Sequence, residues 1–326
     1  MPRNFSRAAR ARRLAPVVLA PAVLAALTLA PGAAMAQQQP APPTSADAPA
    51  GEERVSATSP EAAFDGAAAR KWTISVEPIA WYASPSGKIR LPASGGGGGG
   101  GGTQSEPKLS VLNVDSPRLS PAGAVRFRLG RWGGAVQGFA FGIDERDATL
   151  TSGLVLGDLN LSAGESVRTS LDIWSAEAKA TYALVDEARG TLSDGRDRVR
   201  VRLDAVGGVR AYGVDAEVTR LGASTGANST SAEETWVYPF AGARVDLLLA
   251  ERWGIATEVT YGGWAGGNSA SGLDIQAAFT WQPLSNLGVT VGYRALFSDL
   301  REGSGNERFR VDGGLQGLFA GVVVRF

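Results

Sequence analysis

The sequence predicts an all-β chain in which about ten antiparallel strands close into an up-and-down transmembrane barrel, with eight or twelve strands as alternatives. From Trp72 onward, apolar and polar residues alternate with a period of two, which is typical of β-strands. After the N-terminal leader, no apolar run reaches the roughly eighteen residues of a membrane-spanning helix. The chain also ends on an alternating strand, Arg308–Phe326, whose free edge is satisfied by pairing with the first strand.

Residues 1–36 are predicted to be a secretory signal peptide. Five arginines precede an apolar run from Leu14 to Ala30, and Ala34-Met35-Ala36 forms a small-x-small cleavage site. An uncleaved membrane helix is the alternative, but Pro16 and Pro21 interrupt the run. We therefore expect the chain to be exported and cleaved before Gln37.

Residues 37–70 are rich in Ala, Pro, Gln and Ser and show no periodicity. We expect a disordered periplasmic tether there, because so little apolar surface does not offset the entropy lost on ordering. Residues 71–326 form the predicted barrel domain.

Composition excludes several classes of partner and linkage. The chain has no Cys, which excludes disulfides and a lipid anchor on a cysteine. Five of its 32 basic residues lie in the leader, so the exported chain has 27 basic and 32 acidic residues and a net charge of −5. This mild excess of acid gives no reason to expect nucleic acid as a partner.

Four strands are expected in the first half of the barrel region, and three of them set charged residues against an apolar face. The exception, Gly134–Ile143, leaves its facing open, because Phe139 and Phe141 share parity with Gln137. The inward charges expected are Glu77 on Trp72–Tyr82, Arg126 and Arg128 on Ala122–Trp132, and Glu177 and Lys179 on Arg168–Leu184.

Six further strands are expected, among them Leu273–Trp281 and the closing strand. The clearest is Val199–Tyr212, where four charged residues share one face, an arrangement that suits a wet lumen and not lipid. The inward charges expected in this half are Arg200, Arg202, Asp204 and Arg210 on Val199–Tyr212, Arg244 and Asp246 on Trp236–Leu249, Glu258 on Trp253–Gly263, and Arg294 on Leu287–Phe297.

The expected connections alternate between short and long, as in transmembrane barrels. Two of them fit this rule less well, since 186–197 is long for a turn and the connection around 264–270 is short for a loop. Short turns are expected near Trp132, Glu251 and Ser285, and long loops at 83–120, 144–166 and 213–235.

The first long loop contains eight consecutive glycines, Gly95 to Gly102. A phosphate-binding loop would continue with Gly-Lys-Ser/Thr at the start of a helix, whereas Thr103-Gln104-Ser105 follows here. The glycines therefore predict a flexible loop and no nucleotide site.

Tryptophan and tyrosine lie mostly near the expected strand ends, where in lipid they would form two interfacial girdles. An ordinary sandwich core would place them at strand centres instead. The residues expected in the girdles are Trp72, Trp81, Tyr82, Trp132, Tyr182, Tyr212, Trp236, Tyr238, Trp253, Tyr261 and Trp281.

Gly321, Val324 and Phe326 give the end of the chain a pattern that resembles the C-terminal insertion signal of Gram-negative outer-membrane β-barrel proteins. Phe319 departs from that pattern, which usually has a polar residue there. Gly-x-Arg also recurs on three strands, at 208–210, 242–244 and 292–294. From about Leu203 onward the chain resembles small barrels of the OmpA-like and porin-like superfamily.

This resemblance implies a location in the cell outer membrane, contact with outer-membrane lipid, and assembly by the barrel insertion machinery. On the strand parity above, Gly and Arg of each Gly-x-Arg point inward. The missing side chain is expected to leave room for Arg to lie across the lumen and meet carboxylates.

The chain contains no His, which argues against an enzyme. Outer-membrane acyltransferases, deacylases, phospholipases and the ten-stranded omptin proteases depend on a His general base or proton shuttle. Zinc sites built from His and Cys are excluded for the same reason, and no cofactor or metal is expected. Paired carboxylates, as in glycoside hydrolysis, stay open as an alternative, but pairing with arginine is the simpler interpretation.

We expect a structural or surface-interaction protein whose lumen is filled by paired charges. A narrow porin-like channel for ions or small solutes is the alternative, and a soluble periplasmic barrel is a third possibility. The sequence does not indicate a solute, an oligomeric state or a partner for the loops.

Overall fold

The computed structural model describes residues 72–93, 104–193, 195, 197–222, 227–250, 252–266 and 268–326. The expected leader, the expected tether and the eight-glycine run lie outside these residues. No helix among the described residues is long and apolar enough to span a membrane.

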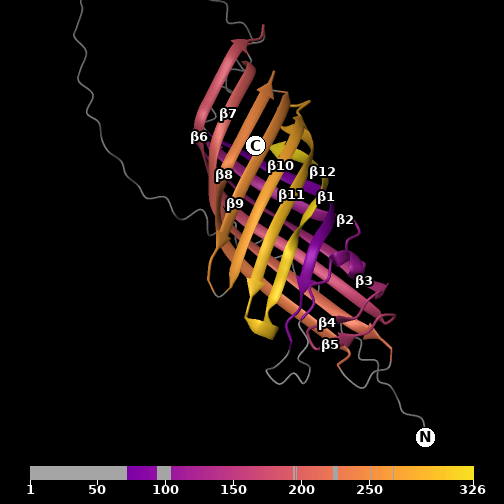
Figure 1. Cartoon of the computed structure of the whole chain (residues 1–326). Coiled ribbons are helices and arrows are strands. Elements are labelled where there is room, and N and C mark those ends of the chain that lie inside the picture. The colour runs from indigo at the N-terminus through magenta and orange to yellow at the C-terminus, as the bar shows by residue number, and fades with distance from the viewer. Residues whose placement is uncertain are drawn as a thin grey trace, which may run out of the picture. The chain divides into compact units, whose positions relative to one another are not determined.

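Ten strands of the described chain close an antiparallel barrel in the ring order β1-β12-β11-β10-β9-β8-β7-β6-β3-β2 (Figure 1). The predicted ten-stranded up-and-down barrel is thereby confirmed. The strands are β1 (Trp72–Arg90), β2 (Arg118–Leu129), β3 (Trp132–Thr149), β6 (Ser166–Thr191), β7 (Asp197–Leu221), β8 (Ser229–Leu249), β9 (Trp253–Trp264), β10 (Ser269–Trp281), β11 (Leu287–Glu302) and β12 (Phe309–Arg325).

The last strand closes the ring against the first. Val76 lies opposite Val324 and Trp81 opposite Phe319 in the β1–β12 ladder. The chain end is held as well, because the Phe326 amide donates to the Ile74 carbonyl at 2.9 Å. This pairing removes the free edge that an open sheet would present.

The two ends of the barrel differ, and we name them by their connections. The turn end carries the short connections at 130–131, 250–252 and 282–286 together with Trp72 and Phe326. The loop end carries the connections 91–117, 150–165, 222–228, 265–268 and 303–308. At the turn end the β6–β7 hairpin extends to Thr191 and Asp197, beyond the other strands (upper part of Figure 1).

An exposed apolar band lies between two rings of outward-facing aromatic residues. Trp72 and Tyr82 bracket this band on β1, and Trp253 and Tyr261 bracket it on β9. The girdle prediction was wrong for four residues, because strand parity, and not nearness to a strand end, decides the face. These buried, inward residues are Trp81, Tyr212, Trp236 and Tyr238.

Beyond the band, the strands continue into segments that were expected to be loops. β7 runs on to Leu221 and β8 starts at Ser229, so most of the expected loop 213–235 is strand. There the burial pattern inverts: Val214 and Val218 are buried while Glu217 is exposed. A polar outer face and an apolar inner face are what a water-surrounded sheet requires.

Two pairs of strands separate near the loop end. β2 pairs with β3 only up to Ala122↔Phe139, and β8 pairs with β9 only from Phe240↔Gly262 onward. At the loop end the wall therefore consists of two sheets, β3-β6-β7-β8 and β9-β10-β11-β12-β1-β2, with one seam between β2 and β3 and another between β8 and β9. Beyond the β9–β10 hairpin, β8 faces β11 across this second seam.

One seam and the mouth are covered by loop structure. The connection after β1 carries a 3-10 helix, η3 (Leu109–Leu112), whose Asn113 C-cap donates to the Asp147 carbonyl on β3 at 3.1 Å. A small hairpin of β4 (Leu154–Leu156) and β5 (Leu159–Leu161) buries Leu156, Leu159 and Leu161. The Ser105 amide ties the two covers together by donating to the Val155 carbonyl at 2.8 Å.

Candidate functional site

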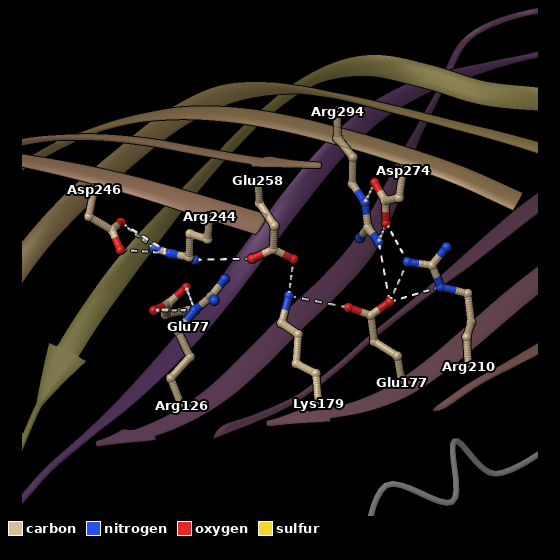
Figure 2. A network of polar contacts seen from close by, with 10 residues as sticks. All are labelled: Glu77, Arg126, Glu177, Lys179, Arg210, Arg244, Asp246, Glu258, Asp274 and Arg294. Carbon is tan, nitrogen blue, oxygen red and sulfur yellow. Dashed lines mark hydrogen bonds and ion pairs between the residues drawn. The ribbon is translucent and has the colours of Figure 1, made fainter. Parts of the chain in front are cut away.

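The centre of the lumen is crossed by a chain of ion pairs (Figure 2). Lys179 on β6 contacts Glu258 on β9, three strands away around the ring, and lies 3.4 Å from Glu177. Arg244 on β8 continues the chain, with 3.4 Å to Glu258 and 2.8 Å to Asp246. The chain thus reaches across the barrel instead of following its wall.

On the loop side the chain ends in a cluster around Asp274. Arg210 on β7 donates to Glu177 at 2.7 Å and to Asp274 on β10 at 2.6 Å. Arg294 on β11 donates to Asp274 at 2.6 Å and lies 3.9 Å from Glu177. Since β6 and β11 stand on opposite sides of the ring, the Glu177–Arg294 contact spans the lumen.

The network is electrically balanced. Figure 2 shows five acids and five bases, and the Arg126–Glu77 pair at 3.0 Å lies beside the chain of ion pairs. The side chains of Lys179, Glu177 and Arg210 are only 1–2 % exposed. Removing such groups from water is costly unless each charge has partners, which is the reason for the dense pairing.

A second, wetter cluster lies at the turn end. Arg128 donates to Asp204 at 2.9 Å, and Arg200 donates to Asp186 at 2.7 Å. Arg202 also contacts Asp186. The side chain of Arg200 is 42 % exposed, so its charge is shared with solvent, whereas Asp204 in the same cluster is fully buried.

Toward the loop end the lumen is filled by a plug of apolar and aromatic side chains. Trp81 and Phe139 meet edge to face at 5.0 Å, and Phe139 lies 6.4 Å from Tyr212. Trp236 on β8 stacks on Phe309 of β12 at 5.7 Å. All five rings are at least 94 % buried, so the plug excludes water from this half of the barrel.

Arg294 joins the plug to the network. Its guanidinium carbon lies 5.6 Å from the ring centres of both Trp81 and Phe139, while its nitrogens bind Asp274. This cation–π arrangement stabilises a charge at the border of the apolar region.

The glycines of Gly-x-Arg serve rings and not the arginine alone. A Cβ placed on Gly208 would lie 2.8 Å from Cζ of Phe240, and that ring also stacks 5.2 Å from the Arg210 guanidinium. A Cβ on Gly292 would lie 2.4 Å from Cζ of Phe319. The expectation that glycine leaves room for arginine is therefore corrected: at these two strands the space holds an aromatic ring, and on β7 that ring, Phe240, also packs against Arg210.

Two cavities interrupt the filling of the lumen. One of about 100 Å³ lies on the turn side of the network, lined by Arg126, Arg244, Asp246, Gln282 and Arg325 among others, and has room for several water molecules. The other, of about 20 Å³, lies beside Trp81 and has room for about one.

The structure distributes the expected lumen residues over these two regions. The central network contains nine of them, whereas Arg128, Arg200, Arg202 and Asp204 belong to the turn-end cluster. The nine are Glu77, Arg126, Glu177, Lys179, Arg210, Arg244, Asp246, Glu258 and Arg294.

Sequence reasoning missed Asp274 and Asp186. Asp274 shares parity with Gln276, opposite Ile275 and Phe279, so the alternation of β10 already placed it inward. Asp186 was assigned to a turn, because the β6–β7 hairpin was expected to end earlier. With Asp274 included, the central network has five acids for five bases.

At the chain end, Val324 faces outward, and a Cβ on Gly321 would lie 2.6 Å from the Pro78 carbonyl oxygen. The insertion signal of Gly321, Val324 and Phe326 stays a prediction. Among the described residues, no group of three or more acidic side chains is arranged to hold a metal ion.

Comparison with known proteins gives only distant matches. No family model matches the chain, and no curated protein matches it. The outer-membrane protease OmpT of Escherichia coli shares 11% identity at a TM-score of 0.44, covering 78% of this chain and 97% of its own. Neisserial surface protein A shares 15% at 0.30, with 78% and 97% covered. The Pseudomonas putida toluene transporter TodX shares 11% at 0.29, with 78% and 90% covered. At these scores the fold assignment rests on the closed ring itself.

Proposed function

We propose that this chain is an outer-membrane β-barrel with a closed lumen, whose role is structural or lies in interactions at its loop end. The observation that carries the proposal is the filled lumen. The central network and the aromatic plug lie one above the other, and each crosses from wall to wall.

The outward band supports a membrane location. On β1 it extends over about ten residues, and at about 3.3 Å per residue with a tilt of about 40° this corresponds to roughly 25 Å of hydrocarbon. Ile74 and Val76 on β1 and Val289 and Val291 on β11 are exposed within it. A soluble periplasmic barrel would have to leave this large apolar surface in water.

Orientation follows from the connections. Transmembrane barrels keep short turns in the periplasm and longer loops outside. The turn end would then face the periplasm, and the η3 segment with the β4–β5 hairpin would face the surroundings of the cell. A surface role fits this end because it carries folded loop structure above the band.

The absence of His excludes a catalytic base of the kind used by outer-membrane hydrolases. The carboxylates of the lumen are paired with arginine and lysine. Neither Glu177 nor Asp274 is therefore a free proton acceptor of the kind that hydrolysis needs. We therefore propose a role without catalysis.

The test is single-channel recording of residues 37–326, refolded in detergent and added to a planar bilayer. A closed lumen predicts insertion without conductance steps. Insertion is verified separately by the mobility shift on heating and by protection of the band from protease. Recovery of the protein from washed outer-membrane fractions tests the location.

Discrete steps whose ion preference changes in Arg210→Ala would establish the narrow channel instead. Protein found only in the soluble envelope fraction would overturn the membrane location and support the soluble barrel.

A further inference from the structure

The seam between β8 and β11 is closed by side chains alone. On the turn side of this seam, β9 and β10 complete the wall, but their hairpin ends at Trp264 and Ser269. β8 extends eleven residues further toward the loop end, Ser229–Pro239, without a ladder partner in β9. Beside the seam, the connection after β11 carries a short 3-10 helix, η4 (Gly305–Glu307).

Three contacts hold the seam. The indole nitrogen of Trp236 donates to the Arg301 carbonyl of β11 at 3.4 Å, and the Trp236 ring stacks on Phe309. Asn268, in the β9–β10 connection, donates to Glu302 at 2.7 Å. Above these, the Glu234 carboxyl group of β8 meets that of Glu302.

The Glu234–Glu302 pair is the unusual contact, because two carboxylates repel unless they share a proton. Neither forms an ion pair among the residues that the structure describes. Glu233 adds a further negative charge from β8, while the Arg301 guanidinium is directed to Asp299 at 2.5 Å. Asp215 stands opposite Glu233 on β7 and adds another.

These surroundings favour a proton between the two groups. Burial, the adjacent carboxyl of Glu302 and the charge of Glu233 raise the pKa of Glu234 to about 7. Glu234 lies one residue nearer the loop end than Thr235, which is level with the outward-facing Trp174, and Glu302 is the last residue of β11.

We propose that the β8–β11 seam is a pH-sensitive closure: it is shut when Glu234 and Glu302 share a proton and loosens when both are ionised. This inference goes beyond the role proposed above and does not depend on it, since it concerns only the wall at the loop end. The movable part is the seam between β8 and β11, whereas η3 covers the seam between β2 and β3.

The direction of the pH effect on the seam follows from proton linkage. A carboxyl group whose pKa is raised in the closed state binds its proton more tightly there than in the loosened state. The closed state is therefore favoured most below the ordinary pKa near 4.5, and this advantage is lost as the pH rises to about 7. At pH 8 the seam has its greatest freedom.

The experiment uses the fact that the chain has no native Cys. Spin labels at Ser231→Cys on β8 and Ser304→Cys beside β11 report the distance across the seam by pulsed electron paramagnetic resonance in detergent. Both positions are exposed, and neither takes part in the closing contacts. A second pair, Ser231→Cys with Thr149→Cys, measures a distance within one sheet as a control.

We expect the seam distance to lengthen and broaden between pH 5 and pH 8, while the control distance does not change. Glu302→Gln and Glu234→Gln keep a hydrogen bond but remove the paired charge, so both should hold the short distance at pH 8. The neighbouring variant Glu233→Gln should retain the response.

A seam distance that does not depend on pH in the parent chain would overturn the proposal. So would a pH response of unchanged size in both Glu302→Gln and Glu234→Gln. The mobility shift on heating, measured at both pH values, ensures that each variant is a folded barrel.

Discussion

From the loop end to the turn end, the lumen changes from tightly packed rings to paired charges in contact with water. Trp81, Phe139 and Tyr212 pack ring against ring, whereas the side chains of Arg128 and Arg200 are partly exposed to solvent. The central network separates the two regions. The difference shows that one barrel wall encloses two interiors, and each has its own source of stability.

The outer face is divided in the opposite sense. Around the band the exposed residues are apolar, while around the plug, nearer the loop end, they include Glu217 and Glu233. The strands that extend beyond the band, β3, β6, β7 and β8, therefore carry an apolar outer face at one end and a polar outer face at the other. Such an exchange is required where a barrel passes from lipid into water.

The largest expected effect comes from leaving buried charge unpaired. Arg210→Met removes one cationic partner from both Glu177 and Asp274, leaves the buried network with one excess negative charge, and should lower the free energy of unfolding by about 3–5 kcal/mol. Urea unfolding in detergent, followed by tryptophan fluorescence, measures this. The matched variant Arg200→Met, in the wetter cluster, should cost about 1 kcal/mol or less. Equal losses would show that the two charge clusters do not differ in burial.

The next effect compares the plug with the outer band. Leu296→Ala, at a fully buried position, should cost about 2–5 kcal/mol because it leaves a cavity. Leu318→Ala, on the outer face, should cost only about 1–2 kcal/mol, since detergent or lipid fills the space. The same unfolding assay ranks the pair, and the reverse order would contradict a close-packed plug.

The outer band can be tested with an inserted charge. Val209→Arg places a guanidinium between the two aromatic rings on β7 and should destabilise the barrel by about 2–4 kcal/mol in lipid vesicles. Thr219→Arg lies on the same face of β7 beyond the band and should change stability by about 0.5 kcal/mol or less. If Val209→Arg is as harmless as its control, the band does not face lipid.

The smallest effect is expected at the tip of the β6–β7 hairpin. Arg189 pairs with Glu187 at 3.1 Å, but its side chain is 83 % exposed. Arg189→Ala should therefore alter the unfolding free energy by about 0.5 kcal/mol or less. A loss near that of Arg210→Met would mean that the hairpin is covered in the assembled protein.

Most of the barrel could be predicted from the alternation of residues. Within the exposed apolar band, the pattern is an apolar outer face and a charged inner face, and Val199–Tyr212 was predicted on that basis. The loop-end segments of β3, β6, β7 and β8 were missed because their pattern is reversed and their outer residues are Ser, Thr, Asp and Glu. Those same residues are frequent in loops.

The candidate site divides in the same manner. Strand parity by itself determined which charged residues enter the lumen, from Glu77 on β1 to Arg294 on β11, because a period of two leaves each side chain one face. Only the tertiary structure decided which charges meet. Lys179 with Glu258 and Arg294 with Glu177 depend on the number of strands between them and on the register of every ladder. Likewise, the seam between β8 and β11 exists because β9 and β10 are short, a relation between strands that local sequence does not encode.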